Sequence, residues 1–186
     1  MGRQRMNIKT IYTIIGASGT GKTTICNHLN IPELVSHTTR PPREGESEGS
    51  PYYFVSKDEY QNIDKIEEAS YAGNHYCLSS KEIDYKLDKN NKVYVIMEKD
   101  GIKQLKNSLG KCADIRIVTI YIHSPLKDII ARLDQNRSKS EMIGRIVNMF
   151  EINELSIPSF ADYCIINKQG MLEKAVKELN HIVGDN

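Results

Sequence analysis

The chain has 186 residues, 39% of them hydrophobic and 26% charged, and its 25 basic side chains nearly balance its 24 acidic ones. This length favours a single domain with its own hydrophobic core, and the balanced charge argues against a protein that binds nucleic acid through a broadly basic surface. No apolar run approaches the roughly 18 residues of a membrane helix, and no apolar stretch follows the basic start as in a secretory signal, so we expect no membrane association.

Short β-branched runs alternate with helical patterns along the chain. Four apolar runs rich in Ile, Val and Tyr have the length of buried strands: 10–15, 93–97, 115–122 and 163–166. Apolar residues recur at helical spacing in 143–150 and 172–179. This alternation predicts an α/β fold built on a parallel sheet. Residues 33–80 interrupt it with turn residues and β-formers, which indicates a small β-rich insertion.

The first apolar run leads directly into a glycine-rich segment, Gly-Ala-Ser-Gly-Thr-Gly-Lys-Thr at 16–23. This segment matches the phosphate-binding pattern G-x-x-x-x-G-K-S/T at every fixed position, between a strand and a helix as the loop requires. Glycines let backbone N–H groups approach phosphate oxygens, Lys22 brings a positive charge to the β- and γ-phosphates, and the Thr23 hydroxyl can ligate Mg²⁺. We predict that a nucleoside triphosphate binds through Gly16, Ala17, Ser18, Gly19, Thr20, Gly21, Lys22, Thr23 and Thr24.

A second candidate anion site lies further along the chain, where Arg40 and Arg43 flank a pair of prolines. Proline fixes φ and cannot continue a helix, so both guanidinium groups extend from a stiff turn. Guanidinium forks match phosphate oxygens, and the hydroxyls of Ser36 and Tyr52 can add neutral donors. From spacing alone, a solvated basic turn is the alternative interpretation.

Longer motifs make the interpretation more specific. Residues 36–46, SHTTRPPREGE, and 49–56, GSPYYFVS, resemble the GMP-binding region of guanylate kinases, as do IEEA at 66–69 and GNHY at 73–76. The resemblance implies a P-loop NTPase fold, with a parallel sheet flanked by helices, a small β-rich insertion that binds the nucleoside monophosphate, and a short lid. It also implies Mg²⁺-dependent phosphoryl transfer from ATP to GMP, with dGMP as a further candidate acceptor.

The same resemblance implies roles for residues on the acceptor side. The GMP phosphate would be held by Ser36, Arg40, Arg43, Tyr52 and Tyr76. Glu67 would accept hydrogen bonds from the guanine N1–H and 2-amino groups, with Glu98 as a second acid and Ser79 as the donor to O6. Adenine would leave these groups unpaired, so guanine is preferred. For Glu67 alone, an exposed helix carboxylate is the alternative.

On the donor side, arginines cluster in 131–146. In the family, arginines of this region lie on and beside a mobile lid and clamp the ATP phosphates, so the resemblance implies that Arg132, Arg137 and Arg145 act with Lys22 in catalysis. Asn167 resembles an asparagine that lies near the adenine of ATP. Ordinary surface arginines and a polar loop residue are the alternatives.

The motifs also indicate how one domain, 1–186, is organised. We expect a core formed by 7–32 and 91–186, a GMP-binding subdomain at 33–90 and a lid at 134–142. The chain departs from the family pattern at several positions, including a shorter lid between Arg137 and Arg145 and Pro51 in place of a common Asp. Cys77 and Leu78 separate Tyr76 from the two serines that follow, so Ser80 competes with Ser79 for guanine O6, and Ile96 stands where an acid is common.

Two other functions remain open at this point. One is a kinase for a sugar phosphate such as ribose bisphosphate, which would not need Glu67 and Glu98 to read a base. The other is a non-catalytic binding module, although such domains tend to lose the phosphate-binding loop that this chain keeps. The cysteines lie too far apart for the common zinc spacings or a disulfide framework, so we expect reduced thiols in a cytoplasmic protein.

Overall fold

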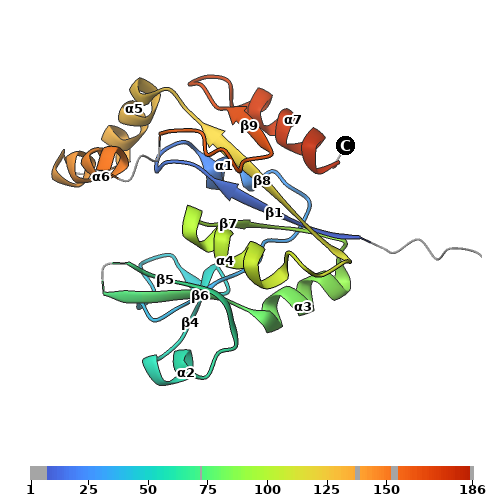
Figure 1. Ribbon diagram of the computed structural model, residues 1–186. Helices are drawn as coiled ribbons and strands as arrows, with labels where there is room; N and C mark the ends of the chain where they lie inside the picture. The colour runs from blue at the N-terminus through green and yellow to red at the C-terminus, as the bar shows by residue number, and fades with distance from the viewer. Residues whose placement is uncertain (1–7, 72, 137–138, 152–154, 185–186) are drawn as a thin grey trace, which may run out of the picture. The chain divides into compact units, whose positions relative to one another are not determined.

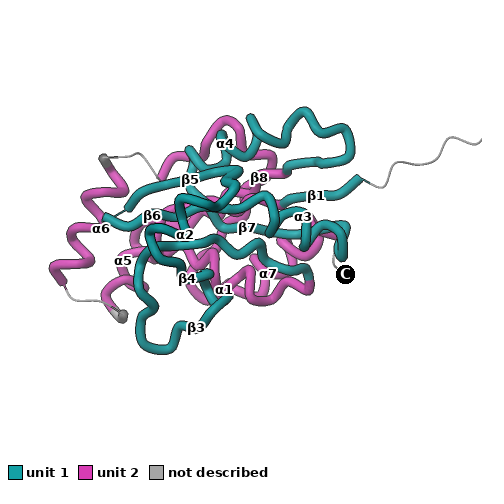
Figure 2. The backbone as a smooth tube through the Cα atoms, turned by 90° about the horizontal axis from the view of Figure 1, so that it is seen from below, with its two compact units in different colours: residues 1–11, 31–117 teal, residues 12–30, 118–186 magenta. Residues whose placement is uncertain are grey.

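The computed structural model describes residues 8–71, 73–136, 139–151 and 155–184. Contacts divide the chain into two compact units, one made of residues 1–11 and 31–117, the other of residues 12–30 and 118–186 (Figure 2). The phosphate-binding loop belongs to the second unit, and every predicted acceptor residue belongs to the first. The predicted donor and acceptor residues therefore form two candidate half-sites, one in each unit.

A four-stranded sheet has the strand order β7-β1-β8-β9. Its strands are β1 (Lys9–Ile15), β7 (Lys92–Ile96), β8 (Ile115–His123) and β9 (Tyr163–Ile166). Each predicted apolar run forms one strand, which confirms the expected α/β fold. Strands β8 and β9 pair in parallel, with Ile120 opposite Tyr163 and His123 opposite Ile166. β-Branched side chains dominate these strands because they suit a pleated surface that is buried on both faces.

Four helices belong to the second unit: α1 (Lys22–Cys26), α5 (Leu126–Asn136), α6 (Lys139–Glu151) and α7 (Leu172–Val183). Helix α7 contacts α1 and β9, and α5 contacts α6 (Figure 1). In α7 the predicted helical pattern marks the buried face, which carries Ala175, Leu179 and Val183. In α6 the pattern predicts the helix but not its buried face, because Met149 is in the core while Phe150 is 59% exposed.

The first unit contains a five-stranded sheet of order β3-β4-β2-β6-β5, so the expected β-rich insertion is confirmed. Its strands are β2 (His37–Thr38), β3 (Ser47–Glu48), β4 (Pro51–Phe54), β5 (Lys65–Tyr71) and β6 (Asn74–Ser79). Strand β2 is parallel to β4 and antiparallel to β6, which makes the sheet mixed. This arrangement places the motif that begins at Ser36 beside the two strands that carry the other predicted phosphate ligands.

Three helices complete this unit: α2 (Lys57–Gln61), α3 (Ser80–Lys89) and α4 (Lys99–Leu109). Helix α3 packs against β6 and β7, and α4 packs against β5. The core between them is apolar and includes Leu34, Leu78, Ile83, Val93 and Leu105. Helix α2 begins with a capping box between Ser56 and Glu59, which satisfies two backbone N–H groups at its start.

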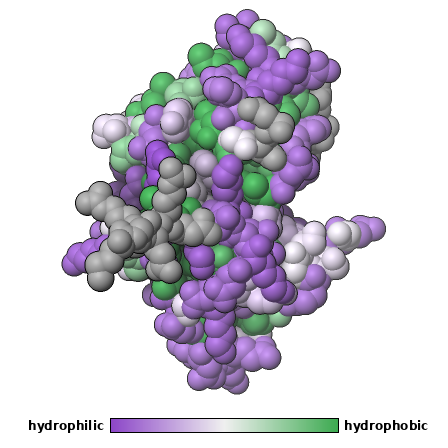
Figure 3. All heavy atoms as spheres, turned by 90° about the vertical axis from the view of Figure 1, so that its right-hand side faces the viewer, coloured by the Kyte–Doolittle hydropathy of each residue, from purple (hydrophilic) through white to green (hydrophobic). Residues whose placement is uncertain are grey.

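The surface is mixed in polarity. On the face shown in Figure 3, hydrophilic side chains predominate and apolar side chains form smaller patches between them. No helix within the described ranges is long and apolar enough to cross a membrane.

Candidate active site

The phosphate-binding loop connects β1 to α1. Two of its glycines lie so close to neighbouring residues that a side chain would not fit. Gly21 has a φ of +90°, which favours glycine, and a Cβ there would lie 2.5 Å from the Nδ2 atom of Asn167. A Cβ on Gly16 would collide with the carbonyl oxygen of Ile122. The fixed glycines of the motif therefore allow the ends of β8 and β9 to approach the loop closely.

Lys22 lies over the loop. Its Nζ donates to the carbonyl oxygen of Gly16 at 2.6 Å and to that of Ala17 at 3.0 Å. The Thr20 hydroxyl donates to the same Ala17 carbonyl at 2.9 Å. The ammonium group is thus held at the loop itself, where the sequence predicts phosphate oxygens to bind.

Arg132 and Asn167 join the loop to the ends of the parallel strands. Arg132 donates through Nη1 to the carbonyl oxygens of Gly19 and Thr20, each at 3.2 Å, and to the Ser124 hydroxyl at 2.9 Å. Its Nη2 donates to the carbonyl oxygen of Asn167 at 3.1 Å, and the Asn167 side-chain amide donates to the Thr20 carbonyl at 2.8 Å. Ser124 and Asn167 follow neighbouring strands at their carboxyl ends, which is where open α/β sheets bind ligands.

The remaining predicted donor residues lie in the same unit. Arg145 reaches the loop from α6, since its Nη1 donates to the Ser18 hydroxyl at 2.7 Å. Arg137 lies outside the described residues. The structure therefore brings Lys22, Arg132 and Arg145 to the loop, and each adds a positive charge where a polyanion would bind.

Thr23, the predicted Mg²⁺ ligand, is exposed in the first turn of α1. In the part of the chain that the structure describes, no three His, Cys, Asp or Glu side chains gather into a metal site. One hydroxyl fits a Mg²⁺ ion that arrives on nucleotide phosphates, because Mg²⁺ keeps several waters and uses few protein ligands in such sites.

Arg40 is at the centre of an aromatic cluster in the first unit. Its guanidinium carbon lies 5.6 Å from the ring centre of Tyr52 and 5.8 Å from that of Phe54, and the Tyr52 and Tyr76 rings meet edge to face at 5.6 Å. Both terminal nitrogens of Arg40 pair with the Glu46 carboxylate, at 2.9 and 3.0 Å. The hydrogen bond from Arg40 holds the pKa of Glu46 below its ordinary value. Three of the predicted phosphate ligands, Arg40, Tyr52 and Tyr76, therefore lie together. The Glu46 carboxylate is the anion that pairs with Arg40 in this structure.

The other two predicted phosphate ligands are placed through their backbones. The Arg43 side chain is exposed, and its backbone N–H donates to Glu46 at 2.8 Å. Ser36 precedes β2, and its carbonyl oxygen accepts from the Tyr53 N–H at 3.0 Å. The backbone of Arg43 is thus tied to the carboxylate that pairs with Arg40, and the backbone of Ser36 is tied to β4.

Glu67 is a buried strand residue, so the alternative of an exposed helix carboxylate is wrong. It is 7% exposed on β5 and faces the start of α4, where a Cβ on Gly101 would lie 3.1 Å from its Oε2 atom. Burial, followed by the charges of Glu98 and Glu68, raises the pKa of Glu67 to about 7. Glu98 itself is exposed where α4 begins. A buried carboxylate of this kind suits a ligand that presents N–H donors.

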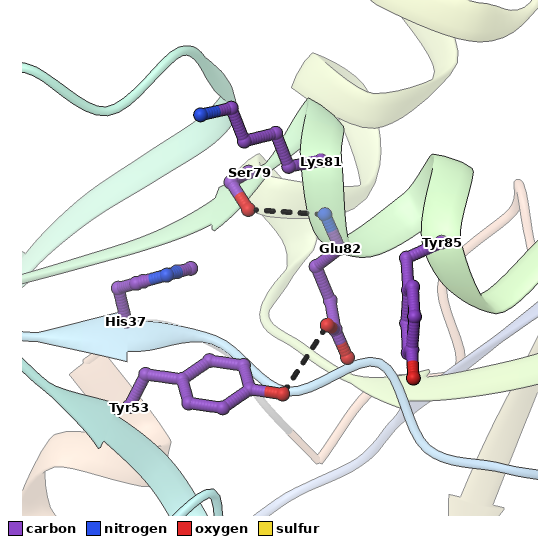
Figure 4. Close-up of a pocket in the computed structure, with 6 residues that line it drawn as sticks. All are labelled: His37, Tyr53, Ser79, Lys81, Glu82 and Tyr85. Atoms are coloured by element: carbon purple, nitrogen blue, oxygen red, sulfur yellow. Dashed lines mark hydrogen bonds between the residues drawn. The ribbon is translucent and has the colours of Figure 1, made fainter.

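Ser79 lies in different surroundings from Glu67. Its hydroxyl caps α3 by accepting from the Glu82 N–H at 3.2 Å, and it lines a pocket of about 310 Å³ with His37, Tyr53, Lys81, Glu82 and Tyr85 (Figure 4). Ser80 donates instead to the Asp64 carboxylate at 2.7 Å. Glu67 is not among the contacts described for either serine, so contact with O6 stays a prediction for both.

Sequence reasoning missed several residues that build these half-sites. Glu46 belongs to the motif at 36–46, but nothing in the spacing of that motif indicates that its carboxylate pairs with Arg40. Ser124 directly follows a buried strand, and that position is the one signal that marks it. Glu82 lies outside the recognised motifs, and only its contacts with Val35 and Tyr53 connect it to the acceptor half-site.

The fold and the donor half-site define a class of protein. A parallel sheet whose first strand leads through a glycine-rich loop into a helix, with a lysine and two arginines held at the loop, is the architecture of P-loop kinases. The guanylate kinase family model matches residues 8–186 of the chain.

Relatives over most of the chain agree with this match. The guanylate kinase of Neisseria gonorrhoeae is 34% identical over 184 residues, covering 93% of this chain and 86% of that protein. That of Fusobacterium nucleatum is 30% identical over 186 residues, covering 96% and 97%. The crystal structure of guanylate kinase from Anaplasma phagocytophilum shares the fold, with a TM-score of 0.62, 22% identity and coverage of 95% of this chain and 84% of that one. The chain belongs to the guanylate kinase family, and it is a nucleoside monophosphate kinase.

Proposed function

We propose that this protein transfers the γ-phosphoryl group of ATP to the phosphate of GMP and releases ADP and GDP. The observation that carries the proposal is a complete phosphate-binding loop in the same chain as the Arg40 cluster and the buried Glu67 carboxylate. The family membership supports the reaction, and the geometry of each half-site supports the residue roles.

On the donor side, Lys22, Arg132 and Arg145 act by charge. Phosphoryl transfer needs little covalent help from a protein, and positioning with charge neutralisation supplies most of the rate. The loop from Gly16 to Thr24 binds the ATP phosphates, and Asn167 lies beside the adenine. Mg²⁺, when bound, neutralises charge on the β- and γ-phosphates, and Thr23 is the residue that would ligate it.

On the acceptor side, GMP displaces Glu46 from Arg40. The phosphate then takes the place of the carboxylate between Arg40, Tyr52 and Tyr76, with Ser36 and Arg43 closing around it. Glu67 reads the guanine because its two oxygens accept from N1–H and the 2-amino group, and Glu98 adds a second acid nearby. Ser79 is the proposed donor to O6. Arg137, in the proposed lid, completes the set.

The organisation inferred from the sequence belongs to the same proposal. The core comprises 7–32 and 91–186, the GMP-binding subdomain 33–90 and the lid 134–142, and the protein acts in the cytoplasm. The division of the acceptor and donor residues between two compact units supports a separate acceptor subdomain, although the acceptor unit also includes residues 91–117.

An assay of ADP release over several acceptors tests this function. GMP, dGMP, AMP, UMP and ribose bisphosphate are compared with ATP as donor, with and without Mg²⁺, and Lys22→Ala serves as the inactive control. Turnover with GMP far above AMP and UMP is the expected result. Turnover with ribose bisphosphate alone identifies a sugar-phosphate kinase, and binding of GMP without any turnover identifies a non-catalytic module.

A further inference from the structure

Glu82 is a buried carboxylate that the proposed reaction does not use. It lies in the first turn of α3 and is 6% exposed. Burial of a carboxylate is unfavourable unless hydrogen bonds and an opposite charge compensate for the lost water. The groups that compensate Glu82 therefore show which parts of the structure it holds together.

Both carboxylate oxygens of Glu82 bind the acceptor half-site. One oxygen accepts from the backbone N–H of Val35 at 3.0 Å. The other accepts from the Tyr53 hydroxyl at 3.3 Å, the bond drawn in Figure 4. Lys86, one helical turn further along α3, lies 3.6 Å away and supplies the positive charge. Val35 directly precedes Ser36, and Tyr53 directly follows Tyr52, so each bond is made next to a proposed phosphate ligand.

The bond to Tyr53 is made on the opposite face of β4 from the Arg40 cluster. Successive side chains of a strand point to opposite faces, so Tyr52 and Tyr53 leave β4 in opposite directions. The Tyr52 ring meets Arg40 and Tyr76, whereas the Tyr53 hydroxyl meets Glu82. The Tyr53 N–H also donates to the Ser36 carbonyl at 3.0 Å, so the two segments that Glu82 holds are already adjacent.

We propose that Glu82 is a positioning residue for the GMP phosphate site. It fixes the segment that ends in Ser36 and the strand that carries Tyr52 in one arrangement, from the rear face of the sheet, without touching the substrate. Helix α3 thereby determines how well the phosphate ligands converge. The inference rests on the proposed function, because it assumes that these residues bind GMP.

The proposed positioning role depends on the hydrogen bonds from Glu82 to Val35 and Tyr53 and not on the negative charge of Glu82. In Glu82→Gln the amide oxygen still accepts from Val35, and the amide NH₂ donates to the Tyr53 oxygen, which can reverse its own role. In Glu82→Ala both bonds are lost. The glutamine variant is therefore expected to rescue GMP binding, which a purely electrostatic role for Glu82 would not allow.

The test compares KM for GMP with KM for ATP in both variants, and measures GMP binding directly by calorimetry. Glu82→Ala should raise the KM and the Kd for GMP about five- to tenfold, with the KM for ATP unchanged, as loss of one or two hydrogen bonds predicts. Glu82→Gln should stay within about twofold of the parent on the same reasoning. Asp84→Ala, an exposed carboxylate on the same helix, is the matched control and should change neither constant.

Three results overturn the inference: an unchanged KM for GMP in Glu82→Ala, an equal rise for both substrates, or a glutamine variant as impaired as the alanine one. If Glu82→Ala does not fold, Tyr53→Phe removes one of the two bonds, and a rise of about threefold in the KM for GMP alone is then expected. No change in that variant overturns the inference. A parent protein that neither binds nor phosphorylates GMP overturns the proposed function instead.

Discussion

We expect Glu67 to make GMP binding dependent on pH, and the pKa of its carboxyl group sets the size of the effect. The pKa of about 7 means that the side chain is largely protonated at pH 6 and largely ionised at pH 8. The ionised fraction falls from about nine-tenths to about one-tenth between these values. Only the carboxylate accepts from both guanine donors, so the apparent Kd for GMP should rise about tenfold from pH 8 to pH 6.

Calorimetric titration of the protein with GMP at constant ionic strength measures this change. Because guanine stabilises the carboxylate, binding at pH 7 should also release about half a proton, which titrations in two buffers of different ionisation enthalpy detect. The GMP phosphate itself titrates near pH 6 and adds a factor of about two at the lower end.

Glu67→Gln separates these contributions, because its amide does not titrate. Its affinity for GMP should be lower at every pH, and its dependence on pH should shrink to the roughly twofold effect of the phosphate. Glu98→Gln should move the midpoint to lower pH, since Glu98 is the main charge that raises the pKa of Glu67. A tenfold dependence that persists in Glu67→Gln, or none in the parent, would refute the assignment.

The same group affects stability in the absence of GMP. The pKa of Glu67 is raised from an ordinary 4.5 to about 7, so the folded state retains a proton that the unfolded state loses. This contribution is complete below pH 4.5 and is lost as the pH rises through 7, and it amounts to about 3 kcal/mol. Urea unfolding should show that loss in the parent and not in Glu67→Gln.

Four further substitutions test the remaining roles. Lys22→Ala should lower kcat by about 10²–10⁴ in the ADP-release assay while leaving thermal unfolding nearly unchanged, and near-parental turnover would make the loop merely structural. Arg40→Ala and Arg43→Ala should each raise the KM for GMP by an amount equivalent to about 1.5–3 kcal/mol, with little effect on the KM for ATP. An equal rise in both KM values would place these arginines outside the acceptor site. Gly21→Ala should destabilise the protein by about 1–3 kcal/mol in urea unfolding and weaken ATP binding, because the new Cβ meets the amide of Asn167; an unchanged midpoint would contradict the described contact.

Local patterns were sufficient for the fold and for the position of the phosphate-binding loop. The runs at 10–15, 93–97, 115–122 and 163–166 are β-branched and short, and each forms a strand of the parallel sheet. The loop at 16–23 lies between a strand and a helix, as its motif requires. These features follow from interactions between residues close in sequence, which a pattern can record.

Contacts between distant residues were not predictable in the same way. The bond from Val35 to Glu82 spans 47 residues and that from Arg132 to Gly19 spans 113, and neither pair has a spacing that marks it. The same limit applies to the face of α6: its apolar residues predict a helix, but tertiary packing selects Met149 and leaves Phe150 exposed. The Arg137 assignment, which falls outside the described residues, stays a prediction.

The hydrogen bond from the Asn167 amide to Thr20 has a consequence for how the protein is made. The two residues are 147 positions apart, and a ribosome that adds about 5–20 residues per second needs on the order of ten seconds to travel from one to the other. During that interval the glycine-rich segment has already left the ribosome, but the asparagine that fills the space beside Gly21 does not yet exist. The nucleotide loop is translated well before Asn167, so the hydrogen bond that joins the two can form only after β9 has emerged from the ribosome.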